Sequence, residues 1–366
     1  MTSEGSEGSL VGTIRQSPPL DLKAPYDPAW VKGKTFVITG GASGFGAAFL
    51  KKWAEHGANV VIGDINVKGG DELVRRIRNE TGNQNLHFVH CDVTDWQSQV
   101  NFFKDAVKLS PHGGIDTVVA NAGIAEPDMG FEIPAGLDST DPPKPNLSTI
   151  NVNLTGVLYT THLALFWLAR NPNSQPVSLS TSPASTPRDR HLLLVGSVAS
   201  LGPFPGRALY AASKHGVCGL FRSLRSSTIV HGVRVNMLCP YFVNTPLITA
   251  PARLALAGAA TGKIEDVVDA GTRFAADTRI CGRGLVVGPK VKVEQREDGE
   301  WALVSKGGED VAVWEPYADD YEECEVFTRR MIGLLNAATR ARGWIGWFTD
   351  LFGVAGYMLK SWLRLQ

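Results

Sequence analysis

The amino-acid sequence predicts an α/β fold: a doubly wound parallel sheet of about seven strands, covered by helices on both faces and followed by a C-terminal hairpin and helical extension. Three observations predict it. From Lys34 to Gly288, short apolar runs alternate with longer helical stretches. The apolar runs have no polar face, as expected of parallel strands that are buried on both sides. A glycine-rich turn joins the first apolar run to the first helical stretch.

The predicted strands are short apolar runs bounded by turn residues. In chain order they span residues 36–39, 59–64, 87–92, 117–120, 192–195, 233–238 and 285–287. The first helical stretch ends at Glu55, and the later ones span residues 71–79, 96–109, 206–230 and 264–276. Parallel strands connected in this way end at one common edge, which is where ligands bind in open α/β sheets.

The alternation defines a central domain over residues 31–288. Residues 1–30 are rich in Ser, Gly, Pro and charge and predict a flexible leader, of which residues 26–30 dock on the core. Residues 125–147 and 171–189 have no core-forming pattern and predict two surface inserts, the second of them mobile.

Residues 289–366 predict a C-terminal extension. Polar and apolar residues alternate around Glu297–Glu300, which is typical of a hairpin, and residues 319–340 have an amphipathic helical pattern. Residues 343–366 hold three of the nine tryptophans. Two interpretations of this aromatic-rich tail stay open: a peripheral contact with a membrane, or packing against the core or across a dimer.

The composition disfavours several classes of function. Lys plus Arg and Asp plus Glu number 36 each, so no basic field exists to recruit nucleic acid. No apolar run is long enough to cross a membrane, and no secretory signal is visible. The five cysteines are scattered without metal-ligand spacing, so we expect reduced thiols, no metal site and a cytoplasmic protein.

The glycine-rich turn, Thr39–Gly46, predicts a cradle for a dinucleotide. Glycines let the backbone approach a pyrophosphate closely, and the pyrophosphate then rests on the N-terminus of the following helix. The predicted cofactor contacts in this turn are Gly40, Ser43, Gly44, Phe45 and Gly46.

Asp64, at the end of the second strand, indicates which dinucleotide is bound. A carboxylate there accepts hydrogen bonds from the adenosine ribose diol and repels the additional phosphate of NADP. Lys68 is the only cation close to it in the sequence. The pattern therefore favours NAD, with NADP the less favoured cofactor.

Polar and small residues also follow the third and fourth strands. Asp92 and Val93 are predicted to bind and pack the adenine edge, and Asn121, Ala122 and Gly123 to let the chain pass close to the nicotinamide ribose. Each signal is weak by itself, because Asp and Asn commonly end strands. Their positions at successive strand ends carry the prediction.

Four residues are candidates for the chemical step. Tyr210 and Lys214 stand four apart in a helical stretch, so both side chains project from one face. A neighbouring ammonium and the positive nicotinamide of NAD⁺ stabilise a phenolate and lower the pKa of Tyr210 toward neutral pH. Ser197, at the end of the fifth strand, can orient a substrate oxygen, and Asn153 can hold a water behind Lys214 that relays the proton to solvent. Each residue taken alone also has an ordinary structural explanation.

Taken together, the motifs resemble those of the short-chain dehydrogenase/reductase family. TGGASGFG at Thr39–Gly46, Asp92–Val93, ANAG at Ala120–Gly123, VNLTG at Val152–Gly156, Ser197 and YAASK at Tyr210–Lys214 occur in the family's order over about residues 32–288. The resemblance implies a Rossmann-like sheet with a catalytic Ser–Tyr–Lys triad extended by an asparagine. Tyr210 would be the acid/base, Ser197 would position the substrate oxygen, Lys214 would tune Tyr210 and bind the ribose, and Asn153 would serve the water relay. Val243 and Thr245 match the family's contacts to the nicotinamide amide.

The chain departs from the family's pattern at three places, the mildest of which is Ala120 before Asn121, where another Asn is common. Pro240–Tyr241 stands where Pro-Gly is usual, which predicts a reshaped nicotinamide loop or a partly filled pocket. The chain also continues well beyond Gly288, which puts the family's common tetramer in doubt. A homodimer through the helices that carry Asn153 and Tyr210 is still expected.

The sequence gives few indications of which substrate is bound. Residues 246–259, which would cover it in this family, are apolar with the single charge of Arg253, so we expect a hydrophobic secondary alcohol or ketone that is steroid-, prostanoid- or polyketide-like. The inserts and the tail are similar to those of filamentous-fungal members, a hint of secondary metabolism. Two alternatives stay open: an NADPH-dependent ketoreductase, and a non-catalytic nucleotide-binding module with the Rossmann fold.

Overall fold

The computed structural model describes residues 17–126, 140–178, 180–227, 232–248, 256–297 and 301–316, with isolated positions between 253 and 341. The chain divides into two compact units, one of residues 14–318 and one of residues 1–13 and 319–366. The helix predicted over 319–340 and the aromatic-rich tail lie, apart from isolated positions, outside the described residues.

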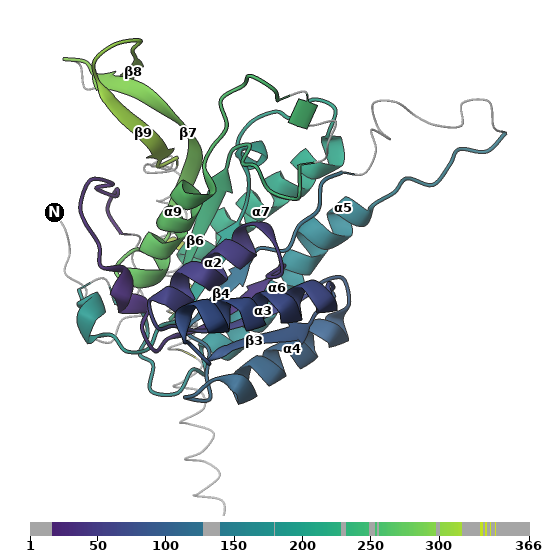
Figure 1. Ribbon diagram of the computed structural model, residues 1–366, viewed down its shortest axis with the longest axis vertical. Coiled ribbons are helices and arrows are strands. Elements are labelled where there is room, and N and C mark those ends of the chain that lie inside the picture. The colour runs from purple at the N-terminus through teal and green to yellow at the C-terminus, as the bar shows by residue number, and fades with distance from the viewer. Residues whose placement is uncertain are drawn as a thin grey trace, which may run out of the picture. The chain divides into compact units, whose positions relative to one another are not determined.

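Seven parallel strands form the main part of the sheet, in the order β3-β2-β1-β4-β5-β6-β7 (Figure 1). Their bounds are β1 Thr35–Thr39, β2 Asn59–Asp64, β3 Leu86–His90, β4 Thr117–Ala120, β5 His191–Val195, β6 Arg234–Pro240 and β7 Gly284–Gln295. The predicted doubly wound parallel sheet is confirmed. The strand order reverses between β1 and β4, and a crevice for a ligand is expected outside the carboxyl ends of these strands.

Helices cover both faces of the sheet. One face packs against α2 Gly44–Glu55, α3 Val67–Thr81 and α9 Ile264–Ala276, the other against α4 Trp96–Leu109, α6 Gly156–Leu168 and α7 Ala208–Ser227. Successive β1 residues alternate between the two cores: Phe36 and Ile38 belong to the first and Val37 to the second, all fully buried. This explains why the strands have no polar face.

Short helical turns complete the connections. They are η1 Pro28–Val31, α5 Ser148–Ile150, the π-helical segment η2 Asn151–Thr155, η3 Pro183–Ser185 and η4 Val198–Ser200. Two of them matter for the site, because η2 carries Asn153 and η4 begins directly after Ser197.

The C-terminal strands extend the sheet beyond the central domain. β7 continues past Gly288, and β8 Trp301–Leu303 and β9 Glu309–Trp314 pair with it in antiparallel fashion, as Figure 1 shows. The hairpin predicted around Glu297 is present as the β7–β8 pair. The third strand, β9, was not predicted, because its pattern is short and lies after a loop rich in glycine and charge.

Residues 17–30, which lie within the predicted 1–30 leader, make contacts with the central domain. Ser17 is buried and hydrogen-bonds the Cys281 carbonyl, and the Tyr26 hydroxyl donates to the Asp269 carboxylate at 2.7 Å. These contacts begin at Ser17, earlier in the chain than the docking predicted for residues 26–30. Residues 1–16 lie outside the described residues.

The predicted second insert, residues 171–189, has both exposed and buried residues. Residues 180–182 are exposed as expected, but Asn171 and Asp189 near its two ends are buried. Asn171 Nδ2 donates to Asp116 Oδ1 at 2.8 Å, and Asp189 pairs with Arg234 at 2.6 Å. These contacts fix both ends of the insert, because buried charged groups at the starts of neighbouring strands require polar partners. In the first insert, residues 140–147 are exposed and residues 127–139 are not described.

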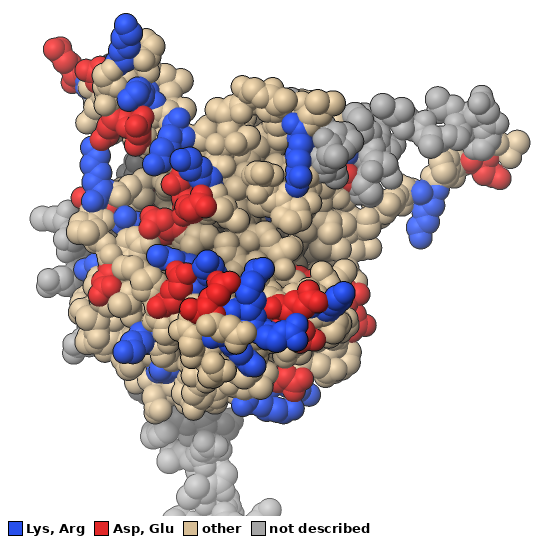
Figure 2. Space-filling model, viewed as in Figure 1, with Lys and Arg blue, Asp and Glu red and all other residues tan. Residues whose placement is uncertain are grey.

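Charge on the visible surface is mixed. On the face in Figure 2, Lys and Arg side chains are interspersed with Asp and Glu rather than gathered into a field of one sign. Within the part of the chain that the structure describes, no helix is both long and apolar enough to cross a membrane. The same residues contain no cluster of three or more His, Cys, Asp or Glu side chains that could hold a metal.

Candidate active site

A cavity of about 400 Å³ lies at the carboxyl ends of β1, β4, β5 and β6. Its wall combines the glycine-rich turn after β1 with the candidate chemical groups on β5 and α7. Of the predicted site residues it contains Gly40, Ser43, Gly44, Phe45, Asn121, Gly123, Ser197, Tyr210, Lys214, Val243 and Thr245. Residues far apart in the sequence therefore meet around one space. Asp64, Asp92, Val93, Gly46, Ala122 and Asn153 are not in its wall.

The glycine-rich turn has the geometry of an anion cradle. Gly40 and Gly44 adopt φ values of +65° and +52°, a region that favours glycine. A Cβ on Gly46 would lie 2.5 Å from the Gly40 carbonyl oxygen, so α2 can start this close to the turn only with glycine there. Ser43 is the N-cap of α2, and its side chain makes no capping hydrogen bond, which leaves first-turn N–H groups for a ligand.

These features fit the pyrophosphate of a dinucleotide. N–H groups at a helix N-terminus carry partial positive charge and attract an anion. Gly40, Ser43, Gly44 and Phe45 would hold the pyrophosphate, and the cavity continues from them to the Tyr210 side of the site.

Asp64 lies at the end of β2, beside this turn. Its Oδ2 accepts a hydrogen bond from the Ala42 N–H at 3.0 Å, and its Oδ1 accepts one from the Asn66 N–H at 2.9 Å. The carboxylate therefore fixes the turn, a role that the sequence analysis did not assign to it. Each oxygen keeps a lone pair for a ribose hydroxyl.

The residues that follow β3 and β4 mainly make hydrogen bonds and packing contacts with other residues of the chain. Asp92 Oδ1 accepts from the Thr94 N–H and hydroxyl, both at 2.8 Å, and Val93 packs in the core beneath Gly156. Asn121 Nδ2 donates to the Thr39 and Gly40 carbonyls at 2.9 Å, which ties the glycine-rich turn to the end of β4. The predicted adenine and ribose contacts of these residues stay predictions.

Ser197, Tyr210 and Lys214 come together in the cavity wall. The Ser197 side chain hydrogen-bonds that of Tyr210, and Ser197 Oγ also accepts from the Ala199 N–H as the cap of η4. Lys214 Nζ lies 5.8 Å from the centre of the Tyr210 ring and donates to the Val195 carbonyl at 3.0 Å. One helical turn of α7 thus places the phenol and the ammonium side by side, as the spacing predicts.

In the chain alone, burial dominates the electrostatics of Tyr210 and Lys214. Burial raises the pKa of Tyr210, and the Ser197 hydrogen bond opposes the shift only in part. Burial lowers the pKa of Lys214 to about 8. In the chain alone, the ammonium therefore does not bring the phenol toward neutral pH, because Lys214 is itself desolvated and directed at a carbonyl. The predicted lowering, which counts on the positive nicotinamide of NAD⁺ as well as on Lys214, stays a prediction.

Asn153 is fully buried in η2, and its side chain is engaged with the loop after β4. Its Oδ1 accepts from the Ile124 N–H at 2.8 Å, and its Nδ2 donates to the Ile124 carbonyl at 2.9 Å. A Cβ on Gly123 would lie 3.4 Å from Asn153 Oδ1 and 3.8 Å from Lys214 Nζ. Gly123 therefore lies between the asparagine and the lysine, and the water relay stays a prediction.

The loop after β6 completes the wall with aromatic rings. Phe204 contacts both Tyr210 and Phe242 edge-on at 5.8 and 5.6 Å, and Tyr241 packs on Phe242 at 4.9 Å. Tyr241 is 38% exposed and lines the cavity, so the bulky residue that replaces the family's usual glycine adds to the wall without closing the space. Of the apolar segment 246–259, Leu247 and Ile248 also line it, and residues 249–252 and 255 are not described.

Sequence reasoning missed two polar residues of the cavity wall, Glu126 and Arg207. Glu126 is 4% exposed, and its Oε2 accepts from the Tyr210 N–H at 3.0 Å. Arg207 Nη1 donates to the Glu126 carbonyl at 2.9 Å. The available signal was an acidic residue only three positions after the ANAG motif, inside a segment assigned to a surface insert.

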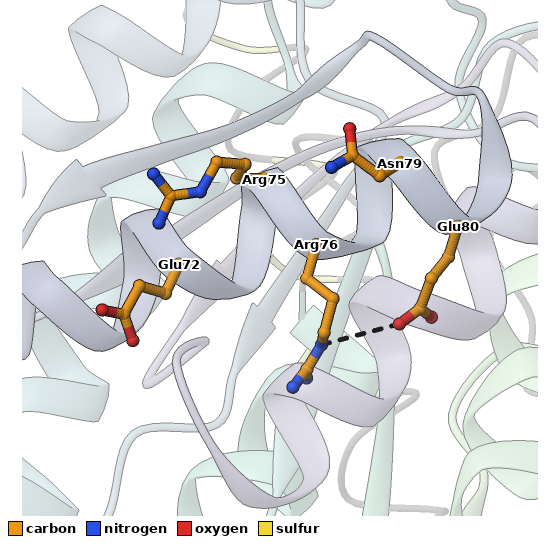
Figure 3. A pocket seen from close by; sticks show the side chains of 5 residues that line it. All are labelled: Glu72, Arg75, Arg76, Asn79 and Glu80. Carbon is orange, nitrogen blue, oxygen red and sulfur yellow. Dashed lines mark ion pairs between the residues drawn. The ribbon is translucent and has the colours of Figure 1, made fainter.

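A second hollow lies on the surface of α3 and has no part in this site. It is lined by Glu72, Arg75, Arg76, Asn79 and Glu80, all from one helix (Figure 3). Arg76 and Glu80 form an ion pair at 3.7 Å across one helical turn. None of the predicted site residues lines this hollow.

Comparison with known proteins identifies the family. The model of the short chain dehydrogenase family matches residues 34–253, more than half of the chain and the whole of the region that builds the cavity. The chain belongs to this family. A short-chain dehydrogenase is a nicotinamide-dependent oxidoreductase that acts on CH–OH groups, and the predicted resemblance is confirmed.

Individual relatives cover the same region. The chain is 37% identical to a 5'-hydroxyaverantin dehydrogenase of Dothistroma septosporum, over 77% of this chain and 93% of the relative. It is 34% identical to an NADP-dependent dehydrogenase of Cochliobolus lunatus, over 74% and 93%. The crystal structure of a 3-ketoacyl-(acyl-carrier-protein) reductase from Brucella melitensis, complexed with NADH, has the same fold, with a TM-score of 0.56, 24% identity and coverage of 70% and 98%.

Proposed function

We propose that this short-chain dehydrogenase interconverts a hydrophobic secondary alcohol and its ketone, with NAD(H) preferred over NADP(H). One observation carries the proposal: Ser197, Tyr210 and Lys214 share a largely apolar cavity with the glycine-rich turn. The 5'-hydroxyaverantin dehydrogenase relative supports a secondary-metabolite alcohol as the substrate class.

The chain's residues divide the work as follows. Ser197 holds the substrate oxygen. In oxidation the Tyr210 phenolate takes the alcohol proton and becomes a phenol, and in reduction the phenol returns that proton to the substrate oxygen. Lys214 fixes the ribose side of the cofactor through its remaining N–H donors. The bound nicotinamide supplies the hydride chemistry. The rings of Phe204, Tyr241 and Phe242 exclude water and favour a flat or extended apolar substrate.

Substitution of Tyr210 by Phe tests catalysis against a non-catalytic nucleotide-binding role. Tyr210→Phe removes one oxygen and should lower turnover about 10²- to 10⁴-fold, the usual contribution of a positioned acid/base. Turnover of hydrophobic alcohols is followed by the absorbance of the reduced nicotinamide, and cofactor binding by its fluorescence. Unchanged turnover in Tyr210→Phe would refute the mechanism, and absence of turnover in the wild type would favour the non-catalytic module.

Asp64 carries the choice of cofactor. Its carboxylate beside the Ala42 N–H would repel a 2'-phosphate, so we expect NADH to bind more tightly than NADPH by about tenfold or more. Asp64→Ser should narrow the difference, whereas Asp71→Ser, on the exposed side of α3, should not. The NADP-dependent relative keeps an NADPH-dependent ketoreductase as the alternative, and tighter NADPH binding by the wild type would establish it.

A homodimer through α6 and α7 is the assembly we propose. On α6, Leu158 and Phe166 are 43% and 44% exposed, and on α4 the Trp96 ring, 41% exposed, packs edge-on against Tyr159 at 5.4 Å. Exposed apolar groups on α4 and α6 favour a second copy against this side of the molecule, and the resemblance to the family adds α7 to the interface. Phe166→Glu should convert the dimer to a monomer in light scattering, and an unchanged mass would exclude this interface.

The aromatic-rich tail and the compartment remain proposals. A cytoplasmic enzyme with peripheral membrane contact through residues 343–366 should float with vesicles, and truncation at Arg342 should abolish flotation. Partitioning that does not change on truncation would leave packing within the protein as the role of the tail.

A further inference from the structure

Glu126 has an oxygen that neither the fold nor the proposed chemistry uses. Glu126 follows the loop after β4, is 4% exposed and lines the cavity. Oε2 accepts from the Tyr210 N–H at 3.0 Å. Oε1 is shielded from solvent and has no hydrogen-bond partner in the part of the chain that the structure describes.

Capping of the N-terminus of α7 accounts for only one of the two carboxylate oxygens of Glu126. Tyr210 lies in the first turn of α7 (Ala208–Ser227), where a negative group that accepts a backbone N–H stabilises the helix. That role requires a single acceptor atom. A buried carboxylate oxygen without a donor is unfavourable, so its retention points to a partner that arrives from the cavity.

The position of Glu126 ties it to the reacting end of the substrate. It is hydrogen-bonded to the main chain of the residue whose phenol contacts Ser197. A substrate whose oxygen lies between Ser197 and Tyr210 therefore extends along a wall that contains Glu126. The neighbouring wall is apolar and aromatic, with Phe204, Phe242 and Leu247.

We propose that Glu126 Oε1 accepts a hydrogen bond from a second hydroxyl group of the substrate, distinct from the one that is oxidised. This inference rests on the proposed function and narrows it to hydrophobic alcohols or ketones that carry a further hydroxyl, with phenols the best match to the aromatic wall. A neutral hydroxyl fits better than an ammonium group, because the Arg207 guanidinium, 2.9 Å from the Glu126 carbonyl, lines the same cavity.

Matched pairs of ligands test the proposal without the need for turnover. The probes are 1-tetralone with a hydroxyl at ring position 5, 6 or 7, each paired with its methyl ether, which fills the same space but donates no hydrogen bond. Their dissociation constants are measured on the full chain saturated with NADH, by calorimetry. We expect the wild type to bind the hydroxy member at least tenfold more tightly than the ether at one ring position, because a hydrogen bond to a charged acceptor contributes about 1.5–3 kcal/mol.

Two variants assign that preference to Glu126. Glu126→Gln keeps the size of the side chain and an oxygen for the Tyr210 N–H but presents an amide N–H group to the cavity, so the hydroxy-to-ether ratio should fall to about one or invert. Glu126→Ala should abolish the ratio as well, and Glu72→Gln, on the exposed surface of α3, should keep it. Thermal melting verifies that each variant is folded.

The outcomes separate this inference from the proposed function. Equal or undetectable binding of both members of every pair by the wild type overturns the role of Glu126, and so does a preference that persists in both Glu126 variants. Absence of alcohol oxidation with preserved discrimination overturns the proposed function alone.

Discussion

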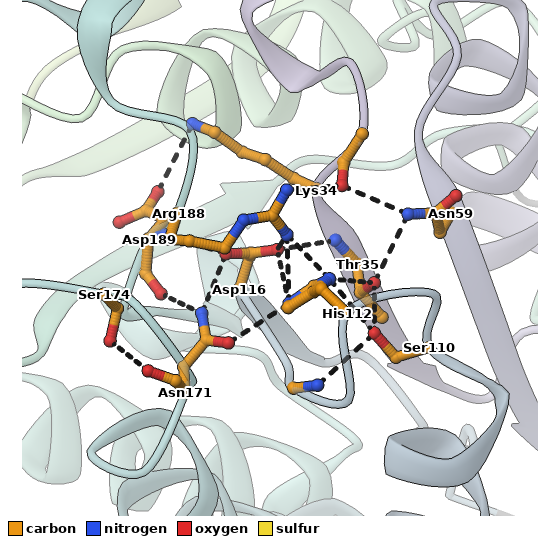
Figure 4. Close-up of polar contacts among 12 residues, drawn as sticks. Lys34, Thr35, Asn59, Ser110, His112, Asp116, Asn171, Ser174, Arg188 and Asp189 are labelled. Carbon is orange, nitrogen blue, oxygen red and sulfur yellow. Dashed lines mark hydrogen bonds and ion pairs between the residues drawn. The ribbon is translucent and has the colours of Figure 1, made fainter.

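The two edges of the same sheet handle buried polar groups in opposite ways. At the carboxyl edge, Glu126 Oε1 has no hydrogen-bond partner among the described residues, and the Ser43 side chain makes no capping hydrogen bond to the first turn of α2. At the amino edge, charged groups beside the strand starts are buried together and neutralise one another (Figure 4). The carboxyl edge keeps hydrogen-bonding capacity around a cavity. The amino edge pairs most of its charged groups within the fold, although Lys34 Nζ is held there by charge alone, 3.9 Å from Asp189 Oδ2 and without a hydrogen bond among the described residues.

Asp189 and Asp116 are the centres of the amino-edge network. Asp189 pairs with Arg234 at 2.6 Å and lies 3.9 Å from Lys34 Nζ, with all three side chains no more than 1% exposed. Asp116 pairs with Arg188 at 2.8 Å and accepts the Thr35 N–H at 2.8 Å. Burial raises the pKa of Asp116, and it also acts to raise that of Asp189, but Arg234 and Lys34 outweigh it there and lower the pKa of Asp189 to about 2.

The largest effect is expected at the amino edge. Asp189→Asn leaves Arg234 and Lys34 as buried cations without a counter-ion and should lower the free energy of unfolding by about 3–5 kcal/mol. Urea denaturation measures the loss. In molecules that remain folded, the dissociation constant for NADH should be unchanged. A loss below about 1 kcal/mol would show that the network does not stabilise the fold.

At the carboxyl edge, a substitution is expected to lower the activity more than the stability. Ser197→Ala removes a hydroxyl that contacts Tyr210 and caps η4, and it should lower kcat/KM roughly 10²-fold, or about 2.7 kcal/mol of transition-state free energy. The loss of stability should stay within the 0.5–2 kcal/mol usual for an N-cap. Steady-state kinetics and melting are compared with those of the wild type. A variant that loses stability without losing activity would reverse the contrast between the edges.

The contrast explains what the sequence predicted and what it did not. The helices Trp96–Leu109 and Ile264–Ala276 match their predicted bounds, because an apolar period and flanking turns are local signals. Gly40, Tyr210 and Lys214 could be predicted as site residues because each belongs to a motif that spans only a few neighbouring residues of the sequence.

The amino-edge network escaped prediction because its members are spread along the chain from Lys34 to Arg234 and their burial cannot be inferred from any one of them. A signal did exist: Lys34, Asp116 and Arg234 each stand at or directly before a strand start, and Asp189 two positions before another. Glu126 escaped for a related reason, since it lies in a segment that resembles a surface insert and acquires its role only when α7 packs beside it.

A smaller effect is expected when the free energy of unfolding is measured as a function of pH. The pKa of Asp189 is about 2 in the folded chain, below the 3.8 of an unperturbed Asp. Its ionised form therefore stabilises the fold fully above the unfolded pKa, and this contribution is lost as the pH falls toward 2. The stability gap between wild type and Asp189→Asn should shrink by roughly 1 kcal/mol from pH 6 to pH 3. A constant gap would mean that Asp189 does not act through its charge.

The smallest effect is expected for a charge pair that belongs to neither edge. Arg76 and Glu80 lie 3.7 Å apart on α3 with 66% and 43% of their side chains exposed, so water and salt screen their attraction. Arg76→Ala should change the free energy of unfolding by less than about 1 kcal/mol, and added salt should reduce even that difference. Urea denaturation at low and high salt is the measurement. Because the chemical type of the pair resembles that of Asp189 and Arg234, a comparable loss would show that burial is not what gives the amino edge its importance.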